Sequence, residues 1–351
     1  MSCKIKAICR KFTLVASFVL VCLIGKSQYN FTGVGKILLE NQKSLGNNFV
    51  ALVYKDGKII YQKETEEFKA RTRAPLGNCS KWLTAALVMT FVDEGKISLD
   101  DRVGMYLPIF ETYGRSDITI RQCLSHQTGI ADNEKGVVKL MEMQRLKFET
   151  LEDEVNSFAK KEVAAKPGVV FNYGNMGLNI AGRVLEAVSK KKFDVLAKQR
   201  IFTPLNMRSS SFTPEERSIN PSTGAFSTAV DYMNFLTMML DKGVFMGKRI
   251  LSEAAVKEME TIQTKDIPKK YIPKAAIGYE YGLGEWIEAS DSNGNSTVVS
   301  CSGLPGTIAF VDKCRNYACV IFIKDPDDEL KKDVYTELKK EIDKQIAASC
   351  N

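Results

Sequence analysis

Lys81 follows Asn78 by three residues at the start of the apolar segment "NCSKWLTAALV". Three residues are close to one helical turn, so the two side chains lie on one helix face and can meet. At this spacing a lysine amine could take the proton of a hydroxyl at the first position, and the oxygen could then attack a carbonyl carbon. Asn78 cannot do this, because a carboxamide nitrogen is a poor nucleophile. Asparagine is a favoured helix N-cap, and we interpret Asn78 as a cap that lacks this chemistry.

No neighbouring residue supplies the missing hydroxyl on the helix face of Lys81. Ser80 is adjacent to Lys81 and therefore lies about 100° away around the helix. His126 is the single histidine in the 351 residues, and the chain has no C-x-x-C pair. This composition argues against a histidine-based triad and against a zinc site. We predict no metal and no cofactor, and any acyl transfer would need a base other than histidine.

The first 27 residues have the layout of a secretory signal peptide. Four basic residues precede a 13-residue apolar run, Phe12 to Ile24, and Gly25 and Ser27 supply the small residues before a cut at Gln28. The run is shorter than the roughly 20 residues of a transmembrane helix, which favours cleavage over the alternative of an uncleaved anchor. We therefore expect export to the periplasm or the extracellular space.

Removal of this segment changes the charge and the cysteine count. It contains five Lys and Arg residues and no acid, so the formal net charge falls from +7 by five, to +2. No excess of positive charge remains that would indicate a nucleic acid partner. An even number of cysteines remains, which permits disulfides in an exported protein and leaves their pairing open. These are Cys79, Cys123, Cys301, Cys314, Cys319 and Cys350.

Strand-like periodicity occurs at both ends of the chain beyond residue 27. Residues 48–63 alternate apolar and polar around Asp56-Gly57, which predicts a β-hairpin. Consecutive short strands are expected between 281 and 324, followed by a charged amphipathic helix from about 327 to 348.

Helical periodicity dominates the middle of the chain. Residues 78–94 predict a helix that is apolar nearly all round and therefore buried, and the region from about 100 to 270 is helix-rich. Strands far apart in sequence most simply share one sheet. We predict an α+β fold with one antiparallel sheet, flanked by helices, and an inserted, mostly helical lobe.

Four segments together resemble the serine β-lactamase and penicillin-binding-protein superfamily, in particular its class C-like and esterase-like branch. The resemblance covers roughly residues 30–345 and implies a single domain over 28–351 with the β-lactamase/transpeptidase-like fold. The segments are "PLGNCSKWLTAALVMTFVDEGKISLDDRVGMYLP", "ITIRQCLSHQTGI", "PGVVFNYGNMGLNIAGRVLEAVSKKKFDVLAKQRIFTPLNMRSSSF" and "GAFSTAVDYMNFLTMMLDKGVFMGKRILS".

The resemblance assigns roles to positions of three motifs. In the first, S-x-x-K, Lys81 is present and Asn78 replaces the nucleophilic serine. The second, Y-x-N, is intact: the family's tyrosine, here Tyr173, assists proton transfer, and its asparagine, here Asn175, binds the substrate amide. His126 matches a structural turn, and we expect a hydrogen-bonded scaffold histidine.

The third motif of the family, K-T-G or H-x-G, is altered. It reads Cys301-Ser302-Gly303 here, so a neutral thiol replaces the cation or imidazole that lines the pocket. Ser302, Gly303 and Leu304 are expected to line the substrate site. The backbone N–H groups of Leu304 and Asn78 could form an oxyanion hole.

Three functions are compatible with this pattern. The first is an exported pseudoenzyme with a retained cleft that binds a small molecule or peptide, such as a cell-wall peptide or another acylated ligand. The second is an active hydrolase, esterase or peptidase-like acyl-transfer enzyme with another nucleophile, for which Cys301 is the best candidate because Lys81 could lower its pKa. The third, a purely structural or partner-binding module, has no positive feature in its favour. The oligomeric state is left open.

Overall fold

The computed structural model describes residues 29–131, 148–212, 219–301, 307–324 and 332–350. The predicted signal peptide lies outside these ranges. Ser302, Gly303 and Leu304 lie outside them too, so their predicted part in the substrate site and the oxyanion hole stays a prediction.

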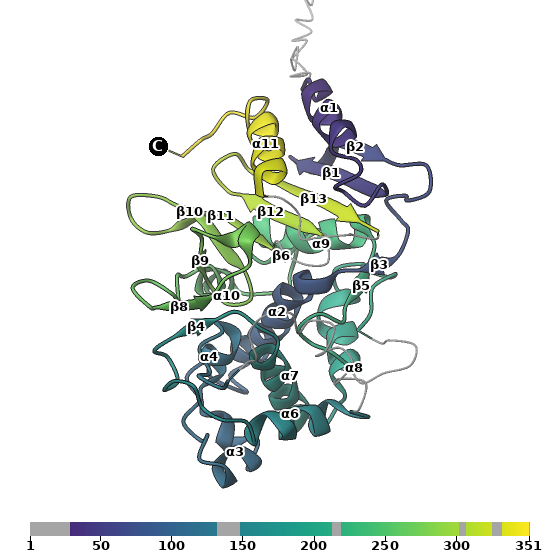
Figure 1. Cartoon of the computed structure of the whole chain (residues 1–351). Helices are drawn as coiled ribbons and strands as arrows, with labels where there is room; N and C mark the ends of the chain where they lie inside the picture. Colours follow the sequence, from purple (N-terminus) through teal and green to yellow (C-terminus); the bar gives the residue numbers. More distant parts are fainter. Residues whose placement is uncertain (1–28, 132–147, 213–218, 302–306, 325–331, 351) are drawn as a thin grey trace, which may run out of the picture.

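Seven antiparallel strands form the main sheet, in the order β2-β1-β13-β12-β11-β10-β9 (Figure 1). The strands are β1 Phe49–Lys55, β2 Lys58–Glu64, β9 Glu280–Tyr281, β10 Trp286–Ser290, β11 Ser296–Cys301, β12 Ile308–Asp312 and β13 Tyr317–Ile323. The predicted hairpin is confirmed, because β1 pairs with β2 across Asp56 and Gly57, which both have positive φ angles. β1 also pairs with β13, so the two ends of the chain share one sheet, as predicted.

Helices cover both faces of this sheet. The helices α1 (Thr32–Glu40) and α11 (Lys332–Asp343) pack on one face. Strand β1 alternates its buried residues between the faces, with Ala51 and Val53 toward α1 and α11, and Leu52 toward the opposite core. Helix α9 (Ala229–Leu240) lies against β13, β1 and β12 on that opposite face. The three layers follow one another in Figure 1.

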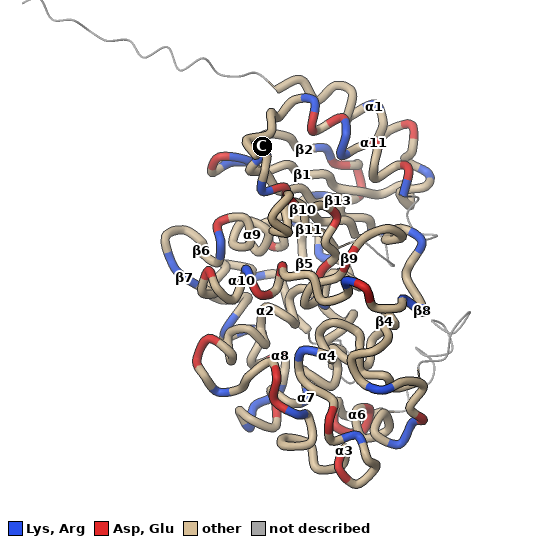
Figure 2. The backbone as a smooth tube through the Cα atoms, turned by 90° about the vertical axis from the view of Figure 1, so that its left-hand side faces the viewer, with Lys and Arg blue, Asp and Glu red and all other residues tan. Residues whose placement is uncertain are grey.

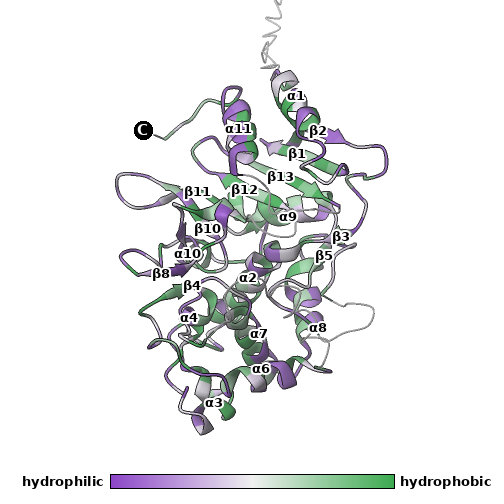
Figure 3. Ribbon diagram, viewed as in Figure 1, coloured by the Kyte–Doolittle hydropathy of each residue, from purple (hydrophilic) through white to green (hydrophobic). Residues whose placement is uncertain are grey.

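Helix α2 (Ser80–Asp93) runs through the centre of the molecule (Figure 1). Every residue from Ser80 to Phe91 is buried, which confirms the predicted buried helix. Its predominantly hydrophobic colouring in Figure 3 agrees with a helix that contacts protein on all sides. A 3₁₀ turn, η1 (Gly77–Cys79), precedes it, so Asn78 lies just outside the α-helix proper.

The helical lobe lies below the sheet in Figure 1. Its elements are η2 Val103–Met105, α3 Ile109–Thr112, α4 Ile120–Leu124, α6 Leu151–Ala159, α7 Met176–Ser189, α8 Phe193–Ala197 and the π-helical turn η3 Lys198–Phe202. The predicted lobe, about 100–270, also included α9. That helix instead packs on the sheet, where it lies against β13, β1 and β12.

Short pairs of strands connect these layers. β3 pairs with β5, β6 pairs with β7, and β4 pairs in parallel with β8. The remaining elements are β3 Ala74–Pro75, β4 Phe171–Asn172, β5 Phe226–Ser227, β6 Val244–Phe245, β7 Lys248–Arg249, α10 Glu253–Met259, β8 Lys269–Tyr271 and η4 Lys274–Ala276.

A disulfide joins Cys314, in the turn between β12 and β13, to Cys350 near the end of the chain. The other described cysteines, Cys79, Cys123, Cys301 and Cys319, are free and buried. Acidic and basic residues are interspersed along the traced chain (Figure 2). Within the described ranges, no helix is long and apolar enough to span a membrane, and no three His, Cys, Asp or Glu side chains form a group that could hold a metal ion.

Candidate active site

Lys81 projects from the first turn of α2, and its partners among the described residues include three oxygen acceptors. Its Nζ donates to Asn78 Oδ1 at 2.7 Å, to Asn175 Oδ1 at 2.9 Å and to the backbone oxygen of Ser222 at 3.4 Å. The side chain is 1% exposed. An ammonium group has three N–H bonds and no lone pair, so a protonated Lys81 donates to these oxygens and cannot act as a base.

The prediction that Asn78 caps the central helix is wrong. The N-cap residue of α2 is Cys79, and no side chain accepts a hydrogen bond there. Asn78 lies one residue earlier, in the 3₁₀ turn, and its carboxamide oxygen accepts from Lys81. A hydrogen bond from a charged ammonium is stronger than one from a backbone N–H, which favours this partner.

The second motif meets the first at the N-terminus of α7. Asn175 directly precedes α7, and Tyr173 follows β4. The Lys81 nitrogen lies 5.0 Å from the centre of the Tyr173 ring. Burial is the main cause that raises the pKa of Tyr173 well above 10.0, and the neighbouring Tyr281 and Cys301 raise it further. Tyr173 therefore carries a neutral phenol and not a phenolate base.

Tyr173 is fixed by a cluster of aromatic rings. It stacks on Trp286 of β10 with ring centres 5.0 Å apart, and its ring centre lies 4.6 Å from that of His126. Phe171 and Tyr281 complete the cluster. The backbone N–H of Tyr173 donates to the oxygen of Tyr271 in β8 at 3.2 Å. The motif is therefore held by the sheet as well as by the lobe.

Cys301 ends β11 and is packed against Cys79. Cys79 Sγ donates to the backbone oxygens of Cys301 and Thr307, both at 3.6 Å. Burial raises the pKa of the Cys301 thiol well above 9.0, the hydrogen bond to Cys79 raises it further, and the smaller effect of Lys81 lowers it. Lys81 thus lowers the pKa of Cys301, as expected, but burial raises this pKa by more. This environment favours the protonated thiol.

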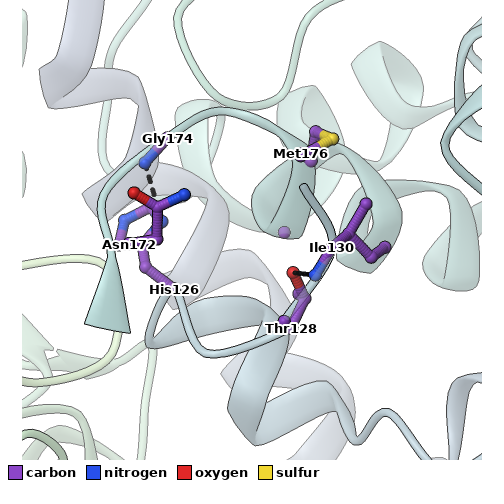
Figure 4. Close-up of a pocket in the computed structure, with 8 residues that line it drawn as sticks. His126, Thr128, Ile130, Asn172, Gly174 and Met176 are labelled. Atoms are coloured by element: carbon purple, nitrogen blue, oxygen red, sulfur yellow. Dashed lines mark hydrogen bonds between the residues drawn. The ribbon is translucent and has the colours of Figure 1, made fainter. Parts of the chain in front are cut away.

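His126 is the hydrogen-bonded scaffold residue that the sequence predicted. Its Nδ1 accepts from the N–H of Gly174 at 3.4 Å (Figure 4). Nε2 therefore carries the proton and donates to the Tyr281 hydroxyl at 3.0 Å. A pocket of about 20 Å³ lies beside it, lined in part by Thr128, Ile130 and Met176. A cavity of that size holds about one water molecule.

His126 is expected to make stability depend on pH. Burial and, secondarily, the positive charge of Lys81 lower its pKa well below 6.5. The unfolded chain therefore binds the proton more tightly, so the contribution of neutral His126 is complete above about pH 6.5 and declines as the pH falls. We expect the stability difference between the native protein and His126→Asn to shrink by about 1.4 kcal/mol per pH unit below this point.

Urea unfolding of both proteins between pH 5 and 7.5 measures this difference. Asparagine suits the position because His126 has a φ of +58°. The difference between the two proteins is needed because Glu285 also makes stability depend on pH. Burial raises the pKa of Glu285 well above 4.5, so its effect on stability has the opposite sign to that of His126. Both proteins contain Glu285, so its effect cancels in the difference. A difference that stays constant over this range would contradict the assignment of a neutral His126.

The family model described as "Beta-lactamase" matches residues 45–342, more than half of the chain. The chain belongs to the β-lactamase family. The matched range includes Asn78, Tyr173 and Cys301, and the match supports a β-lactamase/transpeptidase-like fold.

Three similar proteins share at most 30% of their residues with this one over the matched regions. Penicillin-binding protein 4 of Amycolatopsis lactamdurans is 30% identical over 247 residues, and the match covers 60% of this chain and 62% of that relative's length. A candidate β-lactamase from Bacteroides dorei is 25% identical with a TM-score of 0.79, covering 90% of this chain and 99% of that one. EstCE1, a hydrolase with promiscuous acyltransferase activity, shares the fold at 18% identity, with a TM-score of 0.73 and coverage of 90% and 98%.

Two parts of the site were not predicted from the sequence. The backbone oxygen of Ser222 is the third acceptor of Lys81, and Asn179 orients that segment by accepting from the Ser222 N–H at 3.0 Å. Trp286 supports Tyr173 from the sheet. A backbone acceptor leaves no signal in a sequence, whereas a tryptophan at the start of a predicted strand could have been marked as a support for the motif.

Proposed function

We propose that this β-lactamase-family protein is an exported pseudoenzyme, which binds a small molecule or peptide in the cleft of the family without acylation. The observation that carries the proposal is the contact of Lys81 with both Asn78 Oδ1 and Asn175 Oδ1. The position of the nucleophile holds an amide, and the position of the base holds an ammonium whose donors are engaged. Neither step of acyl transfer, deprotonation or attack, can begin from this arrangement.

The alternative of a thiol hydrolase lacks a reactive group. Cys301 is 3% exposed, and its pKa is raised rather than lowered. A nucleophilic cysteine needs thiolate character and access to the substrate. Of the two hypotheses, the binding protein therefore has the stronger support.

Export rests on two observations. Residues 1–27 combine basic residues, an apolar run and small residues before a cleavage position. The Cys314–Cys350 disulfide is typical of proteins that reside in an oxidising compartment. A periplasmic or extracellular protein of this family would meet cell-wall peptides, which are the ligand source that we propose.

Mass spectrometry of the purified protein tests the loss of chemistry. Separate samples are incubated with benzylpenicillin, a fluorophosphonate and iodoacetamide, and the intact mass is measured. We expect no penicillin or fluorophosphonate adduct, and labelling of the buried Cys301 only after unfolding. Stable labelling of the folded protein by the fluorophosphonate would overturn the proposal. A penicillin or fluorophosphonate adduct that Cys301→Ala removes would establish the thiol enzyme.

A further inference from the structure

The orientation of two side-chain amides defines what the site can recognise. Lys81 Nζ is a donor only, so the groups that face it at 2.7 and 2.9 Å must be the oxygens of Asn78 and Asn175. The NH₂ group of each amide therefore points away from Lys81. None of the hydrogen bonds among the described residues uses either Nδ2 atom as a donor. Both side chains are partly exposed, so these donors can reach a ligand.

The ammonium behind the two amides strengthens them as donors. A carboxamide whose oxygen accepts from a cation is polarised, and its N–H groups become better hydrogen-bond donors. Both oxygens converge on the same nitrogen, so the two amides form one unit with Lys81 at its back. The neighbouring Tyr173, His126 and Cys301 side chains are uncharged, so none of them repels an anion.

We propose that the NH₂ groups of Asn78 and Asn175 together bind a ligand carboxylate, so that the ligand is a free acid and not an ester or amide. A carboxylate offers two oxygens to two donors, and hydrogen bonds to a charged acceptor are stronger than those to a carbonyl. A hydrolase needs a hydroxyl at position 78 to attack a carbonyl, whereas an amide there binds what hydrolysis leaves behind. This inference rests on the proposed function, and it names the ligand class of the same site.

Matched acid and amide pairs test the inference. The probes are phenylacetate with phenylacetamide, and N-acetylglycine with N-acetylglycinamide, and their dissociation constants are measured by ligand-observed NMR at neutral pH. We expect at least one acid to bind roughly tenfold or more tightly than its amide, as a charge-assisted hydrogen bond provides. If each amide binds as tightly as its acid, or if neither acid binds at millimolar concentrations, the inference is wrong.

Asn78→Asp is the variant that tests the predicted carboxylate binding most directly. Aspartate keeps the size of the side chain and an oxygen for Lys81, but it replaces the donating NH₂ group with an anionic oxygen. We expect the affinity for the acid to fall by at least about tenfold, with the same loss in Asn175→Asp. Asn293→Asp, in the exposed turn between β10 and β11, carries the same charge change and should bind like the native protein.

Thermal melts of these variants establish that each is folded before binding is measured. Unchanged acid binding in both folded site variants would contradict the inference. Failure of the proposed function is a separate result, because it would appear as a covalent adduct of the native protein by mass spectrometry, whatever the acid and amide affinities are.

Discussion

Asn78→Ser is expected to turn the protein into a slow esterase. Asn78 and Lys81 are already in hydrogen-bond contact, at 2.7 Å, so a serine hydroxyl at position 78 would lie one turn from the lysine, with Tyr173 beside it. Loss of the Asn78 oxygen would also free one donor of Lys81. General base catalysis contributes about 10²–10⁴-fold, so we expect p-nitrophenyl acetate hydrolysis at least about a hundredfold above the native rate. Strong β-lactamase activity is not expected, because Cys301 stays in place of the cation.

Two controls separate catalysis from incidental reactivity. Asn78→Ala removes the amide without supplying a hydroxyl and should remain at the native rate. The double variant Asn78→Ser with Lys81→Met keeps the hydroxyl but lacks the base, and it should lose the gained activity. An Asn78→Ser protein that folds like the native protein and hydrolyses no ester would mean that the cleft has diverged beyond these motifs.

Gly177→Ala is expected to be among the most damaging single-methyl changes in the molecule. A Cβ atom on Gly177 would lie 2.1 Å from the backbone oxygen of Cys123, where α7 packs against α4. Backbone atoms cannot move aside as a flexible side chain can, so α7 must shift. We expect a loss of about 3 kcal/mol in the free energy of unfolding, measured by urea denaturation.

The same shift should reach the site, because Asn175 precedes α7 by one residue. In the Asn78→Ser background, Gly177→Ala should lower the esterase rate by about a hundredfold, as a displacement of about 1 Å can. Gly35→Ala is the matched control: its added Cβ would meet only the Tyr61 hydroxyl at 3.4 Å, an ordinary contact, and alanine is the better helix former. Equal stability of the two variants would contradict the close packing of α7.

Much of the fold could be predicted because its signals are local. The alternation in residues 48–63 and the Asp56-Gly57 turn specify a hairpin, and the apolar circumference of α2 specifies a buried helix. The position of α9 was not predictable in this way. Its helical period is clear in the sequence, but whether its apolar face packs on the lobe or on β13 depends on tertiary contacts that periodicity does not encode.

The site was predicted as a set of residues but not as a network. Lys81, Tyr173 and Asn175 meet as the motifs predicted, because their spacing places each at the start of a helix or the end of a strand. The orientation of Asn78 was misjudged. A cap and an ammonium partner are both compatible with asparagine at this position, and only the 3₁₀ turn before α2 decides between them.

The loss of acylation is tested most directly by competition in one tube. Native protein labelled with ¹⁵N is mixed with an equal amount of unlabelled Asn78→Ser protein, treated with a fluorophosphonate, digested and analysed by mass spectrometry. The pairing of Lys81 with the Asn78 oxygen predicts an adduct on the unlabelled peptide at position 78 alone. An adduct on the ¹⁵N-labelled protein at Asn78, Lys81, Tyr173 or Cys301, formed at a comparable rate, would contradict it.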